Sequence, residues 1–304
     1  AALAWRSYLE RLGHTTCCIA PNRYPYFLEW MTDIGHIGVF KEDHDGAMAR
    51  FIGEADVIFC MDFNQINRLD RVTDTVTANT TAVRVLIDHH LHPPVDGYAV
   101  QFSDTHACST SYIVYQLLEA MAGTDAIDQA MAESLYVGIM TDTGNFSFSS
   151  LTSDLFRAVA VLIDKGVNVP YVNSSVYNNF SEGRMRLLGY MLNDKMVTDY
   201  EFGVAYVSLT EEEMRRFDFI QGDSEGFVNY PLSIRGIRMS AMFIQTKHSI
   251  RVSLRSRGEV DVNVFARRYF DGGGHRNAAG GKSYVPMNET LENFRKYLRE
   301  YFGA

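Results

Sequence analysis

Two short apolar runs, each followed directly by an aspartate, constrain the fold of this chain more than any other feature. The runs, at residues 55–61 and 83–87, have the length and apolar character of buried parallel strands. Asp62 and Asp88 come directly after them. Helical patterns occupy the positions 110–121, 127–140 and 153–165. Strands and helices that alternate in this way predict an α/β domain with a doubly wound, mostly parallel sheet.

The pattern changes in the last third of the chain. Strand-like segments at 204–209, 239–245 and 250–254 precede a helical pattern at 260–269, a glycine cluster and a closing helical pattern at 291–301. This order predicts a second, smaller α+β domain. We therefore expect a catalytic domain at 1–178, a helical linker at 179–195 and a substrate-binding domain at 196–304.

Composition restricts the kinds of partner. The chain has 304 residues and a formal net charge of −9, and its basic residues are scattered, with a modest gathering between Arg251 and Arg276. Long duplex nucleic acid is usually bound by a basic stripe, so small anionic substrates suit this chain better. We find no membrane-spanning run and no leader, and the four cysteines have irregular spacing. These features predict a cytoplasmic protein without disulfides and allow a homodimer.

Acidic and imidazole side chains follow the two predicted strands. Asp88, His89 and His90 end the second strand, and Asp62 ends the first. The carboxyl ends of parallel strands form the ligand-binding edge of such a sheet. Carboxylate and imidazole together suit manganese, iron or zinc better than calcium. Hydrogen-bonded capping of the strand ends is the alternative, which the second histidine and the matching Asp62 make less attractive.

Two further clusters carry weaker signals. Asp142 lies at the end of a helical pattern, where Gly144 alone would suggest an ordinary helix-ending turn. The run Gly272-Gly273-Gly274-His275 precedes a stretch that we expect to begin a helix, so its N–H groups could converge on an anion. A glycine run can also be a simple flexible turn.

Taken in order, these segments resemble one known family. Four segments carry the resemblance: Ile87-Asp88-His89-His90, Thr141-Asp142-Thr143-Gly144, Ser253-Leu254-Arg255-Ser256, and the glycine–histidine run with Asn277-Ala278-Ala279-Gly280. Together they resemble the DHH/DHHA1 phosphoesterases. The resemblance extends over nearly the whole chain. It is strongest to the stand-alone branch that hydrolyses short oligoribonucleotides (nanoRNases) and 3′-phosphoadenosine 5′-phosphate (pAp).

The resemblance implies a set of site residues. Asp62, His89 and Asp142 correspond to ligands of two divalent ions, manganese first and magnesium as the alternative. Asp88 corresponds to a residue that orients the neighbouring histidine, and His90 to one beside the reacting phosphate. The implied substrate-binding positions are Arg255, Ser256, Gly273, Gly274, His275 and Arg276. The second domain would then act as a ruler that selects short substrates.

One part of the family pattern is not found in the sequence. The family's first motif, a histidine followed by two aspartates, should stand just before a helix like the one that starts this chain. We expect that motif to lie upstream of Ala1. The implied reaction is in-line attack of water with two ions. Hydrolysis of pyrophosphate, polyphosphate or cyclic dinucleotides is the enzymatic alternative. The non-enzymatic alternative, which applies if Ala1 is the true start of the protein, is a metal-free binding protein.

Overall fold

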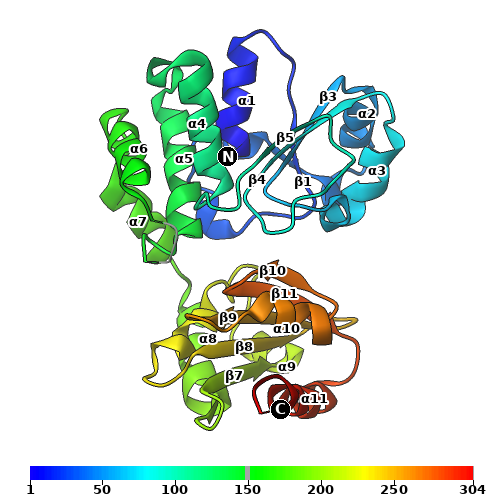
Figure 1. The fold of residues 1–304 in the computed structure, drawn as a ribbon, viewed down its shortest axis with the longest axis vertical. Coiled ribbons are helices and arrows are strands. Elements are labelled where there is room, and N and C mark those ends of the chain that lie inside the picture. The colour runs from blue at the N-terminus through cyan, green and yellow to red at the C-terminus, as the bar shows by residue number, and fades with distance from the viewer. Residues whose placement is uncertain (148–150, 304) are drawn as a thin grey trace. The chain divides into compact units, whose positions relative to one another are not determined.

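The structure, a computed structural model, describes residues 1–147 and 151–303 (Figure 1). Its contacts divide the chain into two compact units, Ala1–Asn179 and Phe180–Ala304. Each unit has its own hydrophobic core, so each is described by itself.

A three-stranded parallel sheet organises the first unit. Its strands have the order β3 (Val57–Met61), β4 (Val83–Asp88), β5 (Val100–Ser103). A separate parallel pair is formed by β1 (Cys18–Ala20) and β2 (Ile37–Val39). The predicted class, α/β with parallel strands, is thereby confirmed for this unit.

Helices cover both faces of this sheet, which is what a doubly wound arrangement requires. Alternate residues of β3 enter different cores: Phe59 and Met61 pack in the larger one, and Ile58 packs in the smaller one. The larger core contains α1 (Ala2–Arg11), α4 (Thr110–Ala122), α5 (Gln129–Asp142), α6 (Ser153–Asp164) and α7 (Val169–Tyr177). The smaller core contains α2 (Ala47–Glu54) and α3 (Thr73–Ala78).

The helices α4 and α5 lie side by side and approach closely at Gly138 (Figure 1). A Cβ atom at Gly138 would lie 1.9 Å from Ser111 Oγ and 2.8 Å from Ser111 Cβ. The absence of a side chain therefore sets the spacing of the two helices. Because Asp142 ends α5, this packing also fixes where its carboxylate lies.

A six-stranded mixed sheet organises the second unit. In the order β10-β11-β9-β8-β7-β6, only β7 and β8 run parallel. The strands are β6 (Val197–Asp199), β7 (Val204–Leu209), β8 (Met239–Gln245), β9 (Ile250–Ser256), β10 (Gly273–His275) and β11 (Ala278–Ser283). This unit has the predicted α+β class.

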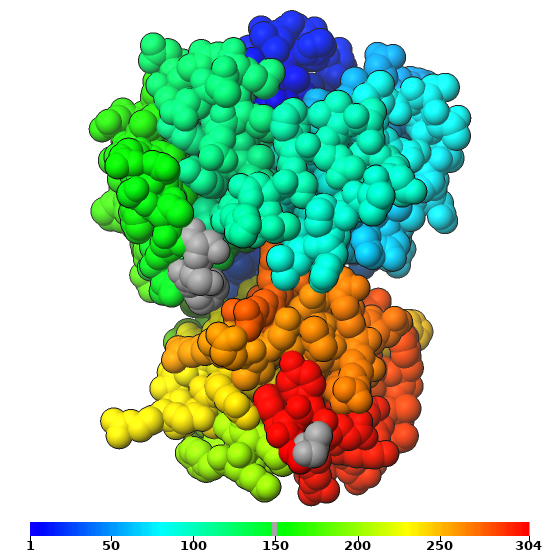
Figure 2. All heavy atoms as spheres, in the orientation of Figure 1, coloured from blue at the N-terminus to red at the C-terminus, as the bar shows by residue number. Residues whose placement is uncertain are grey.

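The two faces of this sheet carry different helices. On one face, α10 (Val262–Tyr269) and α11 (Met287–Phe302) bury Phe265 and Phe294 against alternate residues of β7, β8 and β9. Figure 2 shows α11, in red, on the surface of this unit. On the other face lie α8 (Glu182–Tyr190), the π-helical turn Met191–Lys195 and α9 (Glu211–Arg216).

One prediction about the second unit is wrong. The glycine run does not precede a helix; it opens a hairpin in which β10 pairs with β11. The cause is a close approach of backbones, since a Cβ atom at Gly272 would lie 2.0 Å from the carbonyl oxygen of Gly280. The segment predicted as a linker, 179–195, is helical, and its apolar side chains join the core of the second unit.

The cysteines differ in environment. None of the four forms a disulfide; Cys17 is exposed, and Cys60 and Cys108 are buried. Burial raises the pKa of both buried thiols to about 11. No helix in the described part of the chain is long and apolar enough to span a bilayer.

Candidate active site

Asp62 stands at the carboxyl end of β3, where the backbone turns sharply. Its φ angle is 68°, and its N–H group donates to the Ile87 carbonyl of β4 at 3.1 Å. A left-handed conformation is tolerated by aspartate better than by most residues. The carboxylate is 54% exposed, and one of its oxygens accepts a hydrogen bond from Thr110 Oγ1 at 2.9 Å. Asp62 is therefore held in place and open to a ligand.

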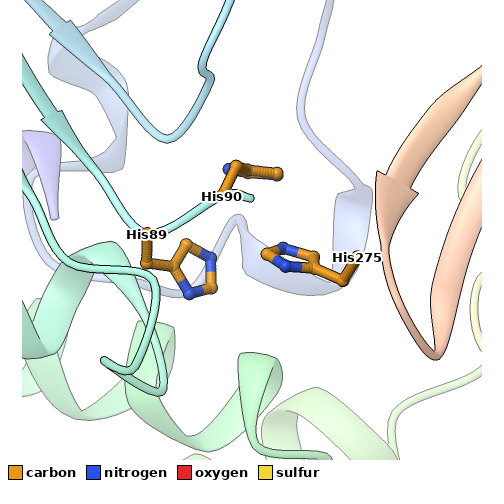
Figure 3. A group of neighbouring side chains, drawn as sticks. All are labelled: His89, His90 and His275. Atoms are coloured by element: carbon orange, nitrogen blue, oxygen red, sulfur yellow. The ribbon is translucent and has the colours of Figure 1, made fainter. Parts of the chain in front are cut away.

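His89 directly follows β4 (Figure 3). Its two ring nitrogens have different surroundings. Nδ1 lies 3.2 Å from the carbonyl oxygen of Ala107, which can only accept, so Nδ1 carries the hydrogen. Nε2 is then a lone-pair donor, 3.5 Å from an Asp62 oxygen and 3.9 Å from an Asp142 oxygen. Burial lowers the pKa of this imidazole, which favours the neutral, metal-binding form.

Asp142 is the last residue of α5. Burial raises the pKa of its carboxyl group to about 7, and the charge of Asp62 adds to this effect. Its side chain is nevertheless 38% exposed, so one edge of the carboxylate is accessible to a cation. The carboxylates of Asp62 and Asp142 repel each other, and a divalent cation would remove that repulsion.

The ligand atoms of Asp62, His89 and Asp142 fit one metal ion. They lie within 4.8 Å of one another. Donors at about 2.0–2.2 Å from an ion are about 3–4 Å apart, close to the two distances from His89 Nε2. A second group with the same spacing consists of Asp62, Asp88 and His90. Asp62 belongs to both, so it is the residue able to bridge two ions.

Asp88 orients His90, whereas His89 is oriented by a backbone carbonyl. The buried Asp88 accepts from His90 Nδ1 at 2.7 Å. The family resemblance predicts that Asp88 orients His89, the proposed metal ligand, whereas in the structure His89 Nδ1 donates to the Ala107 carbonyl. Oδ2 of Asp88 is buried without a hydrogen-bond partner among residues 1–147 and 151–303, as is Oγ of Ser103, its neighbour on β5.

Two contributors to this site were missed by the sequence analysis. Thr110 and the Ala107 carbonyl both lie at the start of α4, where Ser109 caps the helix by accepting from the Tyr112 N–H group. The Ser109-Thr110 pair before an apolar helical pattern is a recognisable cap signal. That signal predicts a helix start but gives no reason to place it beside Asp62.

In the second unit, Arg255 and His275 share a row across the sheet. Both pair with Ala278, Arg255 from β9 and His275 from β10. Directly paired residues present their side chains on the same face, and Ala278 between them contributes only a methyl group. Figure 3 also draws His275, whose imidazole extends from the end of β10. Burial lowers the pKa of the Arg255 guanidinium, so an anion at this position would be favourable.

Other predicted substrate-binding residues have partners within the unit. Ser256 Oγ donates to the Val260 carbonyl at 2.7 Å and accepts from Asn277. Arg276 forms an exposed ion pair with Glu259. The Gly274 N–H group donates to Asn263 at 3.0 Å, and Gly273 is the neighbouring residue. Their roles toward a substrate stay predictions.

Comparison with known proteins follows the division into units. Residues 1–139 match the DHH family, N-terminal domain, and residues 200–304 match the DHHA1 domain. The chain is 30% identical over 251 residues to the bifunctional oligoribonuclease and PAP phosphatase NrnA of Bacillus subtilis, covering 81% of this chain and 73% of that protein. The chain belongs to the DHH/DHHA1 family.

Two other relatives of this DHH protein carry different names. A solved structure of an exopolyphosphatase-related protein from Bacteroides fragilis is 37% identical, with a TM-score of 0.91 and coverage of 98% of this chain and 87% of that one. The cyclic-di-AMP phosphodiesterase GdpP of Bacillus subtilis is 28% identical over 72% of this chain and 32% of its own length. The family resemblance predicted from the sequence is confirmed.

Proposed function

We propose that this DHH protein is a metal-dependent phosphoesterase that hydrolyses short oligoribonucleotides and pAp. The observation that carries the proposal is the orientation of His89, whose Nε2 faces the carboxylates of Asp62 and Asp142 while Nδ1 donates to a carbonyl. Strand capping would not require a neutral, fixed imidazole between two acids. The NrnA relative, named for both activities, supports the choice of substrate.

The protein residues divide the work of hydrolysis. Divalent ions, manganese or magnesium, supply a water of lowered pKa and positive charge for the phosphoryl oxygens when bound. Asp62, His89 and Asp142 would hold them, and Thr110 fixes the rotamer of Asp62. His90, whose Nδ1 hydrogen is directed to Asp88, presents Nε2 to a phosphate oxygen or a leaving oxygen.

In this proposal, the second unit selects substrates that carry a second phosphate or nucleotide. Arg255 and His275 would bind a phosphate or nucleotide that is not the one being cleaved. Binding energy from such a remote group raises the efficiency toward substrates that carry it. A featureless aryl phosphate has no such group and gains nothing.

Substitution of Arg255 tests the choice of substrate. We expect Arg255→Ala to lower kcat/KM for a dinucleotide or pAp by roughly ten- to hundredfold, the value of a charged hydrogen bond, and to affect p-nitrophenyl phosphate far less. Steady-state kinetics with manganese measures both. Equal losses on both substrates would contradict the proposal.

The relatives named above define the competing outcomes of the same assay. If the wild-type protein prefers polyphosphate or pyrophosphate, the reading favoured by the Bacteroides fragilis structure replaces ours. If it prefers cyclic di-AMP, the GdpP-like reading does. If His89→Ala binds nucleotides like the wild type and neither protein hydrolyses any of them, the chain is a binding protein.

A further inference from the structure

The three consecutive glycines of the second unit are not equivalent. Gly272 and Gly274 are required by the hairpin itself: a Cβ atom at Gly274 would lie 2.4 Å from the Ala278 carbonyl oxygen, and its φ is +151°. Gly273 has neither constraint. The nearest atoms to a Cβ there would be Asn263 Oδ1 at 3.5 Å and the Arg267 guanidinium at 3.6 Å, which is ordinary contact. Among residues 1–147 and 151–303, no atom lies close enough to require glycine at 273.

Asn263 connects this glycine to helix α10. It is 2% exposed, and its Oδ1 accepts from the Gly274 N–H group at 3.0 Å and from Arg267 Nε at 3.1 Å. Arg267 lies one turn after Asn263 on the same helix, the spacing at which side chains meet. One buried amide thus fixes both the hairpin and the direction of the guanidinium, which lies beside Gly273.

The contacts of Arg267 differ from those of the nearby arginines Arg268 and Arg276. Arg268 lies 5.1 Å from the ring of Tyr269, and Arg276 pairs with Glu259 at 2.6 Å. Within residues 1–147 and 151–303, no carboxylate forms a salt bridge with Arg267. Arg267 is exposed, its hydrogen bond to Asn263 uses Nε, and its Nη2 atom would lie 3.6 Å from a Cβ atom built on Gly273.

We propose that Arg267, held by Asn263 beside Gly273, is a specificity-determining residue that binds a second phosphate of the substrate. The inference rests on the proposed function, since the first phosphate is the one hydrolysed. A guanidinium with fixed orientation offers two parallel N–H donors to phosphate oxygens, and glycine lets the phosphate approach the backbone. The ligand class is a nucleotide with a phosphate besides the scissile one.

Binding of two matched nucleotides tests this assignment. Dissociation constants for pAp and for adenosine 3′-monophosphate, which lacks the second phosphate, are measured by calorimetry on the whole chain with divalent ions chelated. We expect Arg267→Gln to weaken pAp binding by about tenfold while the monophosphate changes little. The salt dependence of pAp binding should also become shallower, because one ionic contact is lost.

Two further variants make the result decisive. Arg268→Gln removes the adjacent charge on the same helix and should leave both dissociation constants unchanged. Gly273→Ala fits the space sterically, so it should keep the melting temperature and weaken pAp binding selectively. The inference is overturned if Arg267→Gln behaves like Arg268→Gln, or if it weakens both nucleotides equally.

The proposed function is tested separately, by hydrolysis of pAp with manganese restored. If pAp binding depends on Arg267 as expected but no hydrolysis occurs, the phosphoesterase proposal fails and the phosphate site stands. If hydrolysis occurs and the wild type binds both nucleotides with the same affinity, the phosphate site fails and the phosphoesterase proposal stands.

Discussion

At the scale of single residues, Asp142 has the most informative titration. Its pKa of about 7 in the folded, metal-free protein is far above the usual value for aspartate, because of burial and the nearby Asp62 charge. The folded state therefore holds a proton that the unfolded chain has already released. The stability from this group is complete at low pH and declines as the pH rises from about 4 to 7.

The substitution Asp142→Asn measures how the titration of Asp142 changes the stability of the folded protein. In the presence of a chelator we expect the wild type and the variant to have similar melting temperatures below pH 4, where the acid is largely protonated in both the folded and the unfolded state and resembles the amide. Above pH 7 the wild type should melt lower than the variant. Adding manganese at pH 8 should reverse the order, since only the wild type retains the ligand. A difference in melting temperature that stays constant between pH 5 and 8 would refute the pKa assignment.

At the scale of elements, the contact between α4 and α5 determines where Asp142 lies. Alanine favours a helix over glycine by about 1 kcal/mol, whereas a Cβ atom 1.9 Å from Ser111 Oγ forces the helices apart at a cost of about 1–3 kcal/mol. We expect Gly138→Ala to lower the free energy of unfolding and to weaken manganese binding. Urea denaturation and metal titration measure the two effects.

The compensating change serves as the control for Gly138→Ala. Removing the Ser111 side chain makes room for the new methyl group, so Ser111→Gly combined with Gly138→Ala should recover the metal affinity. If the single variant is as stable as the wild type and binds manganese equally well, the two helices do not depend on this contact.

The sequence predicts some elements of the site better than others, for physical reasons. The ends of β3 and β4 were predictable because buried strands are apolar runs and the acids that end them stand out. The three-residue strands β1, β2 and β6 are too short to show a periodicity. The Ala107 carbonyl could not be predicted, since every residue has one, and only the folded chain brings it to His89. The hairpin at the glycines depends equally on tertiary pairing with β9.

At the scale of the whole molecule, the predicted metal ligands Asp62, His89 and Asp142 all lie in the first unit. A ligand stabilises the unit that binds it, so manganese at a hundredfold excess over its dissociation constant should stabilise this unit by about 2.7 kcal/mol, or about 5–10 °C. Scanning calorimetry of the full chain should show one transition whose temperature rises with manganese.

A fragment of residues 180–304, which has its own cores, should melt at a temperature independent of manganese. Manganese sensitivity of that fragment would contradict the assignment, and Asp62→Asn in the full chain should abolish the shift.

The origin of the three ligands has a consequence for the order in which the protein matures. Asp62 and His89 directly follow β3 and β4, Asp142 ends α5, and apolar packing places all three elements. The last ligand to be synthesised is fixed by helix contacts that need no ion. Loading would therefore follow folding, and the choice among competing cellular metals would be made by a set of side chains whose spacing is already fixed.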